Sequence, residues 1–118
     1  MSTPRFDFSD HIQEVDIAGN LFKMNCSTKT GDFLQKVGAN LRSMATDLKS
    51  GKITEENVID YCKSVFDTIL GQGATDTIFS GRERTIDDAS DLLLYLTQVA
   101  RSYQENRRDA ITRRIVMK

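Results

Sequence analysis

The sequence is short of the residues that build most metal and disulfide sites. Its 118 residues include two cysteines, Cys26 and Cys62, which do not form a CxxC pair, and one histidine, His11. A zinc site needs about four ligands, so these counts exclude a zinc site made of cysteine and histidine. Cys62 falls on the apolar face of a predicted helix, where we expect a small buried hydrophobic side chain rather than half of a disulfide.

Long apolar runs and a strong net charge are also missing. No run approaches the roughly 18 residues that a membrane helix needs, and the start MSTPRFDFSD lacks the apolar core of a signal peptide. We therefore expect a cytoplasmic protein without a membrane partner. The net charge of −1 does not by itself attract nucleic acid, and a chain of this length suits one domain with its own core.

Lysine is absent between Lys63 and Lys118, which bears on the glycine-rich stretch GQGATDTIFSGR at residues 71–82. A Walker loop needs a lysine directly after its last glycine, and a dinucleotide loop needs a third glycine where Asp76 stands. Neither phosphate-binding loop fits, so we interpret the glycines as turn residues. The turn glycines that we predict are Gly19, Gly51, Gly71, Gly73 and Gly81.

Residues 12–26 have the pattern of a β-hairpin. Val15 and Ile17 alternate with acidic residues, the segment Ala18-Gly19-Asn20 supplies turn residues, and a strand-like run resumes at Leu21. We predict strands at about 12–17 and 21–26, after a flexible leader at 1–10. An isolated hairpin is marginal in water, so it must pack on the helices or on another subunit.

The period changes after about residue 30, where apolar residues recur at spacings of three and four. This spacing predicts amphipathic helices, and Thr54 and Thr85 stand where capping residues are expected. The expected fold is mainly α, with an N-terminal β-hairpin followed by a bundle of three to four helices in one domain at 11–105. The helices that we predict lie at about 31–49, 55–70, 74–79 and 86–105.

The last predicted helix has more apolar residues than one buried face requires. Leu92 and Leu96 lie on its main apolar face, whereas Leu94 and Tyr95 point elsewhere. We therefore expect this helix to be buried on more than one side, either in the core or against a partner subunit.

The chain becomes basic toward its end. Residues 101–118 contain six basic and two acidic residues, a net charge of +4, so the rest of the chain carries −5. We expect a basic C-terminal extension at 106–118. The partner of such a segment is either nucleic acid or a protein with acidic or helical segments, and we favour a protein because no nucleic-acid recognition motif is present.

Nothing in the sequence assembles into a catalytic site. The acidic pairs Asp87-Asp88 and Glu55-Glu56 stand at predicted helix starts, where acids complement the helix dipole. His11 has only Ser9 and Asp10 as polar neighbours in the leader, and we expect it exposed or at the hairpin edge. We predict a protein that is not an enzyme and has no metal and no cofactor.

The order of these parts resembles the tail assembly chaperones of long-tailed, siphovirus-type phages and prophages of Gram-positive bacteria. The resemblance covers about residues 6–105. Its most specific piece is ILGQGATDTIF at residues 69–79, followed by Gly81-Arg82 and the leucine-rich stretch DLLLYL.

The resemblance implies a non-catalytic role in tail morphogenesis. Such proteins work in the cytoplasm of the infected or lysogenic host, are absent from the mature virion, and bind the tape measure protein and tail tube subunits. They self-associate, in some members into open spirals, and many have a longer form made by a programmed frameshift. The candidate contact residues, left over after one core is filled, are Phe6, Phe8, Ile78, Phe79, Leu94 and Tyr95.

A second function remains open from the sequence. A small helical nucleic-acid-binding regulator would use the basic segment at 106–118 as its binding surface.

Overall fold

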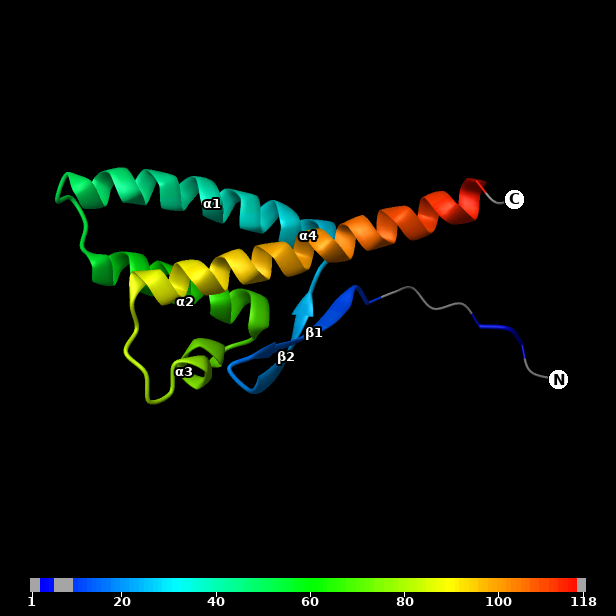
Figure 1. Cartoon of the computed structure of the whole chain (residues 1–118), viewed down its shortest axis with the longest axis horizontal. Helices are drawn as coiled ribbons and strands as arrows, with labels where there is room; N and C mark the ends of the chain where they lie inside the picture. The colour runs from blue at the N-terminus through cyan, green and yellow to red at the C-terminus, as the bar shows by residue number, and fades with distance from the viewer. Residues whose placement is uncertain (1–2, 6–9, 117–118) are drawn as a thin grey trace.

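The computed structural model describes residues 3–5 and 10–116. In this part of the chain a two-stranded antiparallel hairpin precedes four helices (Figure 1), so the predicted fold class is confirmed. The elements are β1 (Ile12–Ile17), β2 (Asn20–Asn25), α1 (Thr28–Lys49), α2 (Glu55–Leu70), α3 (Ala74–Ile78) and α4 (Ile86–Val116).

The hairpin turn is built by Ala18 and Gly19. Both have positive φ, 54° and 86°, which gives the turn a twist that matches the two strands. The sequence had suggested Gly19 and Asn20 for this conformation, but Asn20 already pairs with Ile17 as the first residue of β2. The Asp16 carboxylate accepts a hydrogen bond from the Gly19 amide at 2.9 Å and so holds the turn.

Threonine side chains cap two of the helices as predicted. The Thr54 hydroxyl accepts from the Asn57 amide at 3.2 Å, and the Asn57 side chain accepts from the Thr54 amide at 3.0 Å. At the start of α4 the Thr85 hydroxyl accepts from the Asp88 amide at 3.2 Å. The Asp88 carboxylate binds Arg82 at 2.9 and 3.1 Å, so the capping box expected there is formed on one side only.

Helix α4 is longer than the sequence pattern indicated. We predicted a helix at about 86–105 followed by a basic extension, whereas α4 continues to Val116. The chain contains no glycine or proline after Gly81, so nothing local ends the helix. Arg113 and Arg114 lie in its last turn, where positive charge complements the helix dipole.

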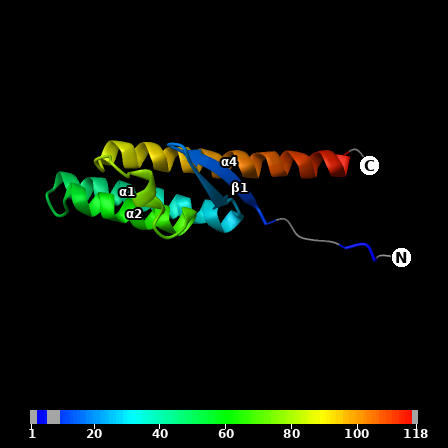
Figure 2. The same ribbon diagram turned by 90° about the horizontal axis from the view of Figure 1, so that it is seen from below.

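One hydrophobic core joins the hairpin to the helices. Helix α2 is central, since it packs against α1, α3, α4 and β2, and Figure 2 shows α4 in a layer apart from α1 and α2. Phe66 of α2, Met24 of β2 and Leu96 of α4 are among the largest fully buried side chains. The hairpin therefore packs on the helices of its own chain.

The C-terminal part of α4 extends past the start of α1 (Figure 1). We call residues 105–116 the overhang. No helix among the described residues is long and apolar enough to cross a membrane.

Candidate interaction surfaces

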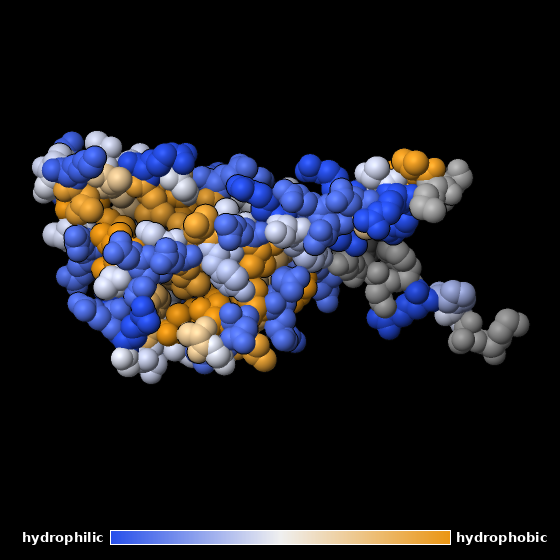
Figure 3. All heavy atoms as spheres, viewed as in Figure 1, coloured by the Kyte–Doolittle hydropathy of each residue, from blue (hydrophilic) through white to orange (hydrophobic). Residues whose placement is uncertain are grey.

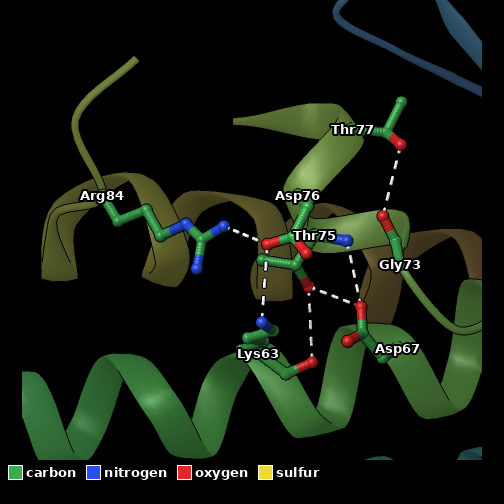
Figure 4. A network of polar contacts seen from close by, with 7 residues as sticks. All are labelled: Lys63, Asp67, Gly73, Thr75, Asp76, Thr77 and Arg84. Atoms are coloured by element: carbon green, nitrogen blue, oxygen red, sulfur yellow. Dashed lines mark hydrogen bonds and ion pairs between the residues drawn. The ribbon is translucent and has the colours of Figure 1, made fainter. Parts of the chain in front are cut away.

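The segment at 69–79 is held in place by a polar network (Figure 4). Thr75 is buried, and its amide donates to Asp67 Oδ1 at 3.0 Å. The Thr75 hydroxyl lies 2.8 Å from the same carboxylate oxygen and 3.3 Å from the Lys63 carbonyl oxygen. A buried hydroxyl with such partners fixes the short helix α3 on α2.

A second carboxylate ties the following loop to α2. Asp76 accepts a hydrogen bond from Arg84, and its Oδ1 lies 3.4 Å from Lys63 Nζ. The hydrogen bond from Arg84, with the nearby Lys63 charge, lowers the pKa of Asp76, and Arg82 likewise lowers the pKa of Asp88. Carboxylates held ionised in this way are poor proton donors near neutral pH.

Gly71 and Gly73 turn the chain between α2 and α3. Their φ angles are 114° and 84°, a region that side chains other than glycine rarely adopt. The amide of Gly71 donates to the Asp67 carbonyl, and Thr77 donates through its hydroxyl to the Gly73 carbonyl. Positive φ is found at all five predicted turn glycines: Gly19, Gly51, Gly71, Gly73 and Gly81.

The cysteines and the histidine have structural surroundings. Cys26 and Cys62 are buried free thiols, and burial raises the pKa of both. His11 lies at the hairpin edge, where its Nδ1 is 3.3 Å from the Tyr103 hydroxyl and the two rings meet edge to face. Within residues 3–5 and 10–116, no cluster of three or more His, Cys, Asp or Glu could hold a metal ion.

The predicted contact residues divide into two groups. Leu94 and Tyr95 are 59% and 38% exposed on α4, so a partner can reach them. Phe79 does not fit this prediction, because it is 8% exposed and belongs to the core, against which Ile78 also packs. The turn after α3 folds Phe79 back toward Phe66 and Ala89, which line one small cavity with it. Phe6 and Phe8 lie outside the described residues.

An apolar groove between α1 and α4 was missed by the sequence reasoning. It has a volume of about 150 Å³, and α2 contributes Val58 and Cys62 to it. The apolar spacing along α1 indicates one buried face, but only Leu34 and Val37 of that helix are fully buried. The residues lining this α1–α4 groove are Leu41, Ala45, Leu48, Val58, Cys62, Ile86, Ala89 and Ser90.

Figure 3 shows the contrast between this groove and the end of α4. Apolar side chains fill much of the visible surface between α1 and α4, whereas the overhang is mainly hydrophilic. The overhang carries four arginines and two acidic residues. Its exposed apolar side chains are Ile111 at 44%, Ile115 at 70% and Val116 at 73%.

Comparisons of the chain with protein-family models, with curated proteins and with solved structures give no match. The segment that carries the resemblance, residues 69–79, has a structural role, because its polar contacts fix α3 on α2. The exposed or partly exposed apolar side chains described above lie along α1 and α4.

Proposed function

We propose that this chain is a non-catalytic tail assembly chaperone of a long-tailed phage or prophage of Gram-positive bacteria. It self-associates and binds the tape measure protein and tail tube subunits during tail morphogenesis. The observation that best supports this proposal is the α1–α4 groove, whose lining is almost entirely apolar. The residues at 69–79 add the sequence resemblance.

The groove suits a helical client. An amphipathic helix binds by laying its apolar face into a hydrophobic groove, with contacts spaced three and four residues apart. In the α1–α4 groove, Leu41, Ala45 and Leu48 supply such a spacing along one wall, and Ile86 lies on the other. A long, largely helical tape measure protein offers repeated helices of this kind.

The client-binding part of the proposal is tested by a charge placed in the groove. Ala45 is exposed and lines the groove, so Ala45→Glu should abolish co-purification with a tape measure protein from the same phage or prophage, while the helical CD signal stays. Ser43→Glu is the matched control, because Ser43 is exposed on α1 and lies outside the groove lining. Equal binding by both variants would contradict the assignment of the groove.

Self-association is tested by light scattering behind a sizing column over a range of concentrations. We expect species larger than a dimer that grow with concentration. Leu94→Glu should reduce them without loss of helical signal, because Leu94 is 59% exposed. A strict monomer at every concentration would count against the chaperone.

One observation favours the second candidate function, a nucleic-acid-binding regulator. The overhang exposes Arg108, Arg113 and Arg114, the last two beyond the residues that lie beside the start of α1, and arginines on one exposed helix can follow a phosphate backbone. A salt-dependent shift with DNA that disappears on deletion of 106–118 would support this function. Absence of any shift at low salt would exclude it.

A further inference from the structure

A second groove lies between strand β1 and helix α4, on a different part of the molecule from the α1–α4 groove. It has a volume of about 320 Å³, within the range of pockets that hold small ligands or peptide segments. We call it the β1–α4 groove, and its lining residues are Gln13, Glu14, Val15, Tyr95, Gln98, Val99, Ser102, Tyr103 and Asn106.

One wall of this groove is a strand with an open edge. In the described residues the sheet has two strands, so β1 pairs with β2 on one side only. At the open end of the hairpin the Cys26 amide donates to the His11 carbonyl at 2.7 Å, and at the turn Ile17 pairs with Asn20. These pairs show that the backbone groups of His11 and Ile17 face β2. Because inward and outward residues alternate along an antiparallel strand, the backbone groups of Ile12, Glu14 and Asp16 face outward.

The side chain of Gln13 supports this orientation. Its Nε2 donates to the Glu14 carbonyl at 3.1 Å, so this carbonyl is not used by the ladder with β2. The Gln13 side-chain amide thus donates to a carbonyl that could instead accept from the backbone N–H of an added strand. An open strand edge beside a helix is a geometry that binds extended peptides by adding a strand.

The side chains indicate what kind of strand fits. Tyr95, Val99 and Tyr103 of α4 form the apolar and aromatic part of the floor, so side chains that face α4 should be apolar. On the opposite face, an added strand would lie beside Asp16 and beside Glu14, which already faces Lys23 of β2 on its other side. Opposite charges on neighbouring strands attract. Glu14 is also the one charged residue among those that line the groove, so the matching side chains should be basic.

A second copy of this chain is a poor occupant of this edge. Antiparallel pairing of two β1 strands would bring Glu14 and Asp16 of one chain beside the same residues of the other. Like charges on neighbouring strands are destabilising. Because β1 of a second copy is disfavoured, we assign this edge to a strand of a different protein.

We propose that β1 binds an extended segment of a partner protein, in which apolar and basic residues alternate, as a third strand of the sheet. The segment lies in the β1–α4 groove, with its backbone paired to Ile12, Glu14 and Asp16 and its apolar side chains against α4. This inference does not depend on the chaperone function, which uses the α1–α4 groove.

The test uses the full chain and a short fluorescent peptide in which lysine and valine alternate. We expect the peptide to bind and to slow hydrogen exchange at the outward amides of Ile12, Glu14 and Asp16. The same peptide N-methylated at alternate residues should not bind, since it cannot form the strand hydrogen bonds. Equal binding by the N-methylated peptide, no binding by either peptide, or protection confined to residues 107–116 would overturn the proposal.

A pair of variants at one position separates backbone pairing from charge. Proline is tolerated where the strand N–H faces outward, so Glu14→Pro should keep the β1–β2 ladder and lose the docking hydrogen bond. We expect it to bind about tenfold more weakly than Glu14→Ala, which loses the charged side chain but keeps the backbone N–H. Equal affinity of the two variants, with the β1–β2 amides still protected, would contradict strand addition.

A variant on α4 keeps the test decisive if Glu14→Pro disturbs the hairpin. Ser102 is exposed and lines the groove, so Ser102→Arg should block the peptide by its bulk and its positive charge. Ala45→Glu, in the α1–α4 groove, should leave peptide binding unchanged. Loss of peptide binding in Ala45→Glu but not in Ser102→Arg would place the peptide in the wrong groove and overturn the proposal.

Discussion

Helix α4 contains two regions that differ in how much of the helix the rest of the chain covers. From Ile86 to Gln104 one face of the helix is covered by the rest of the chain, and Leu96 and Ala100 are buried there. In the overhang the helix continues beyond the start of α1, and Ile115 is 70% exposed. The first region is ordered by tertiary packing, whereas the second depends on local helix propensity and on continuation from the packed region.

The difference shows what a partner could add. Nucleation is the unfavourable step of helix formation, and the packed part of α4 supplies the nucleus on which the overhang continues. Within the described chain, Arg107 and Ile111 lie beside the start of α1, and further stability toward the end of the overhang must come from a partner. A partner that covers Ile111 and Ile115 would therefore stabilise the overhang without changing the core.

The largest expected effect compares two truncations on the same helix. Leu96 is 0% exposed, so Leu96→Ala should lower the free energy of unfolding by about 2–5 kcal/mol. Ile115→Ala removes a similar side chain from the overhang and should change it by less than about 0.5 kcal/mol. Urea unfolding followed by CD measures both, and a similar loss in the two variants would show that the overhang is packed in solution.

The next effect tests the polar network that anchors α3. Thr75→Val keeps the shape of the side chain but removes a buried hydroxyl that lies 2.8 Å from Asp67 Oδ1, so we expect a loss of about 1–3 kcal/mol. Thr77→Val is the control, because the Thr77 hydroxyl is exposed and bonds only the Gly73 carbonyl. Equal unfolding midpoints for wild type and Thr75→Val would mean that the network contributes little.

The sequence predicted the parts of this fold that depend on local signals. The hairpin at 12–26, the caps at Thr54 and Thr85, and the turn glycines follow from short-range chemistry, and the structure has them. The start of α1 and the end of α4 were misplaced, because a helix without a breaker ends where packing or capping stops it. The basic residues after residue 105 change the charge of the chain but not its preference for a helical backbone, so the helix continues through them.

The candidate surfaces were less predictable than the fold. Periodicity shows which side chains share a face, and it placed Leu94 and Tyr95 off the main face of α4. It cannot show how much of a face its neighbours cover, so the partial exposure of Leu41 and Leu48 in the α1–α4 groove was missed. Phe79 was misassigned for the converse reason, because the chain turns it back inside after α3.

A smaller effect compares the two regions of α4 by removing one methyl group from each. Ala110→Gly should weaken the helix by about 1 kcal/mol, but only locally, with faster hydrogen exchange in the overhang and an unchanged global unfolding midpoint. Ala100→Gly carries the same change into the packed region, where Ala100 is 4% exposed, and should lower the midpoint. A global effect of Ala110→Gly would show that the overhang unfolds together with the core.

The smallest effect is the acid dependence of the ion pairs in the packed region. Arg84 and Arg82 lower the pKa of Asp76 and of Asp88. A carboxyl with a lower pKa in the folded state stabilises the fold above its unfolded value of about 3.9, and this contribution is lost as the pH falls through the folded value. Unfolding midpoints should therefore drop on acidification below about pH 4.

Substitution shows whether Asp76 contributes to this drop. Asp76→Asn should make the acid dependence shallower and lower the midpoint slightly at neutral pH. The effect should be small because the ion pair is open to solvent. Asp109→Asn in the overhang serves as the comparison, since Asp109 has no ion pair within the described residues. If both variants had the same acid dependence as the wild type, the contact with Arg84 would not stabilise the fold.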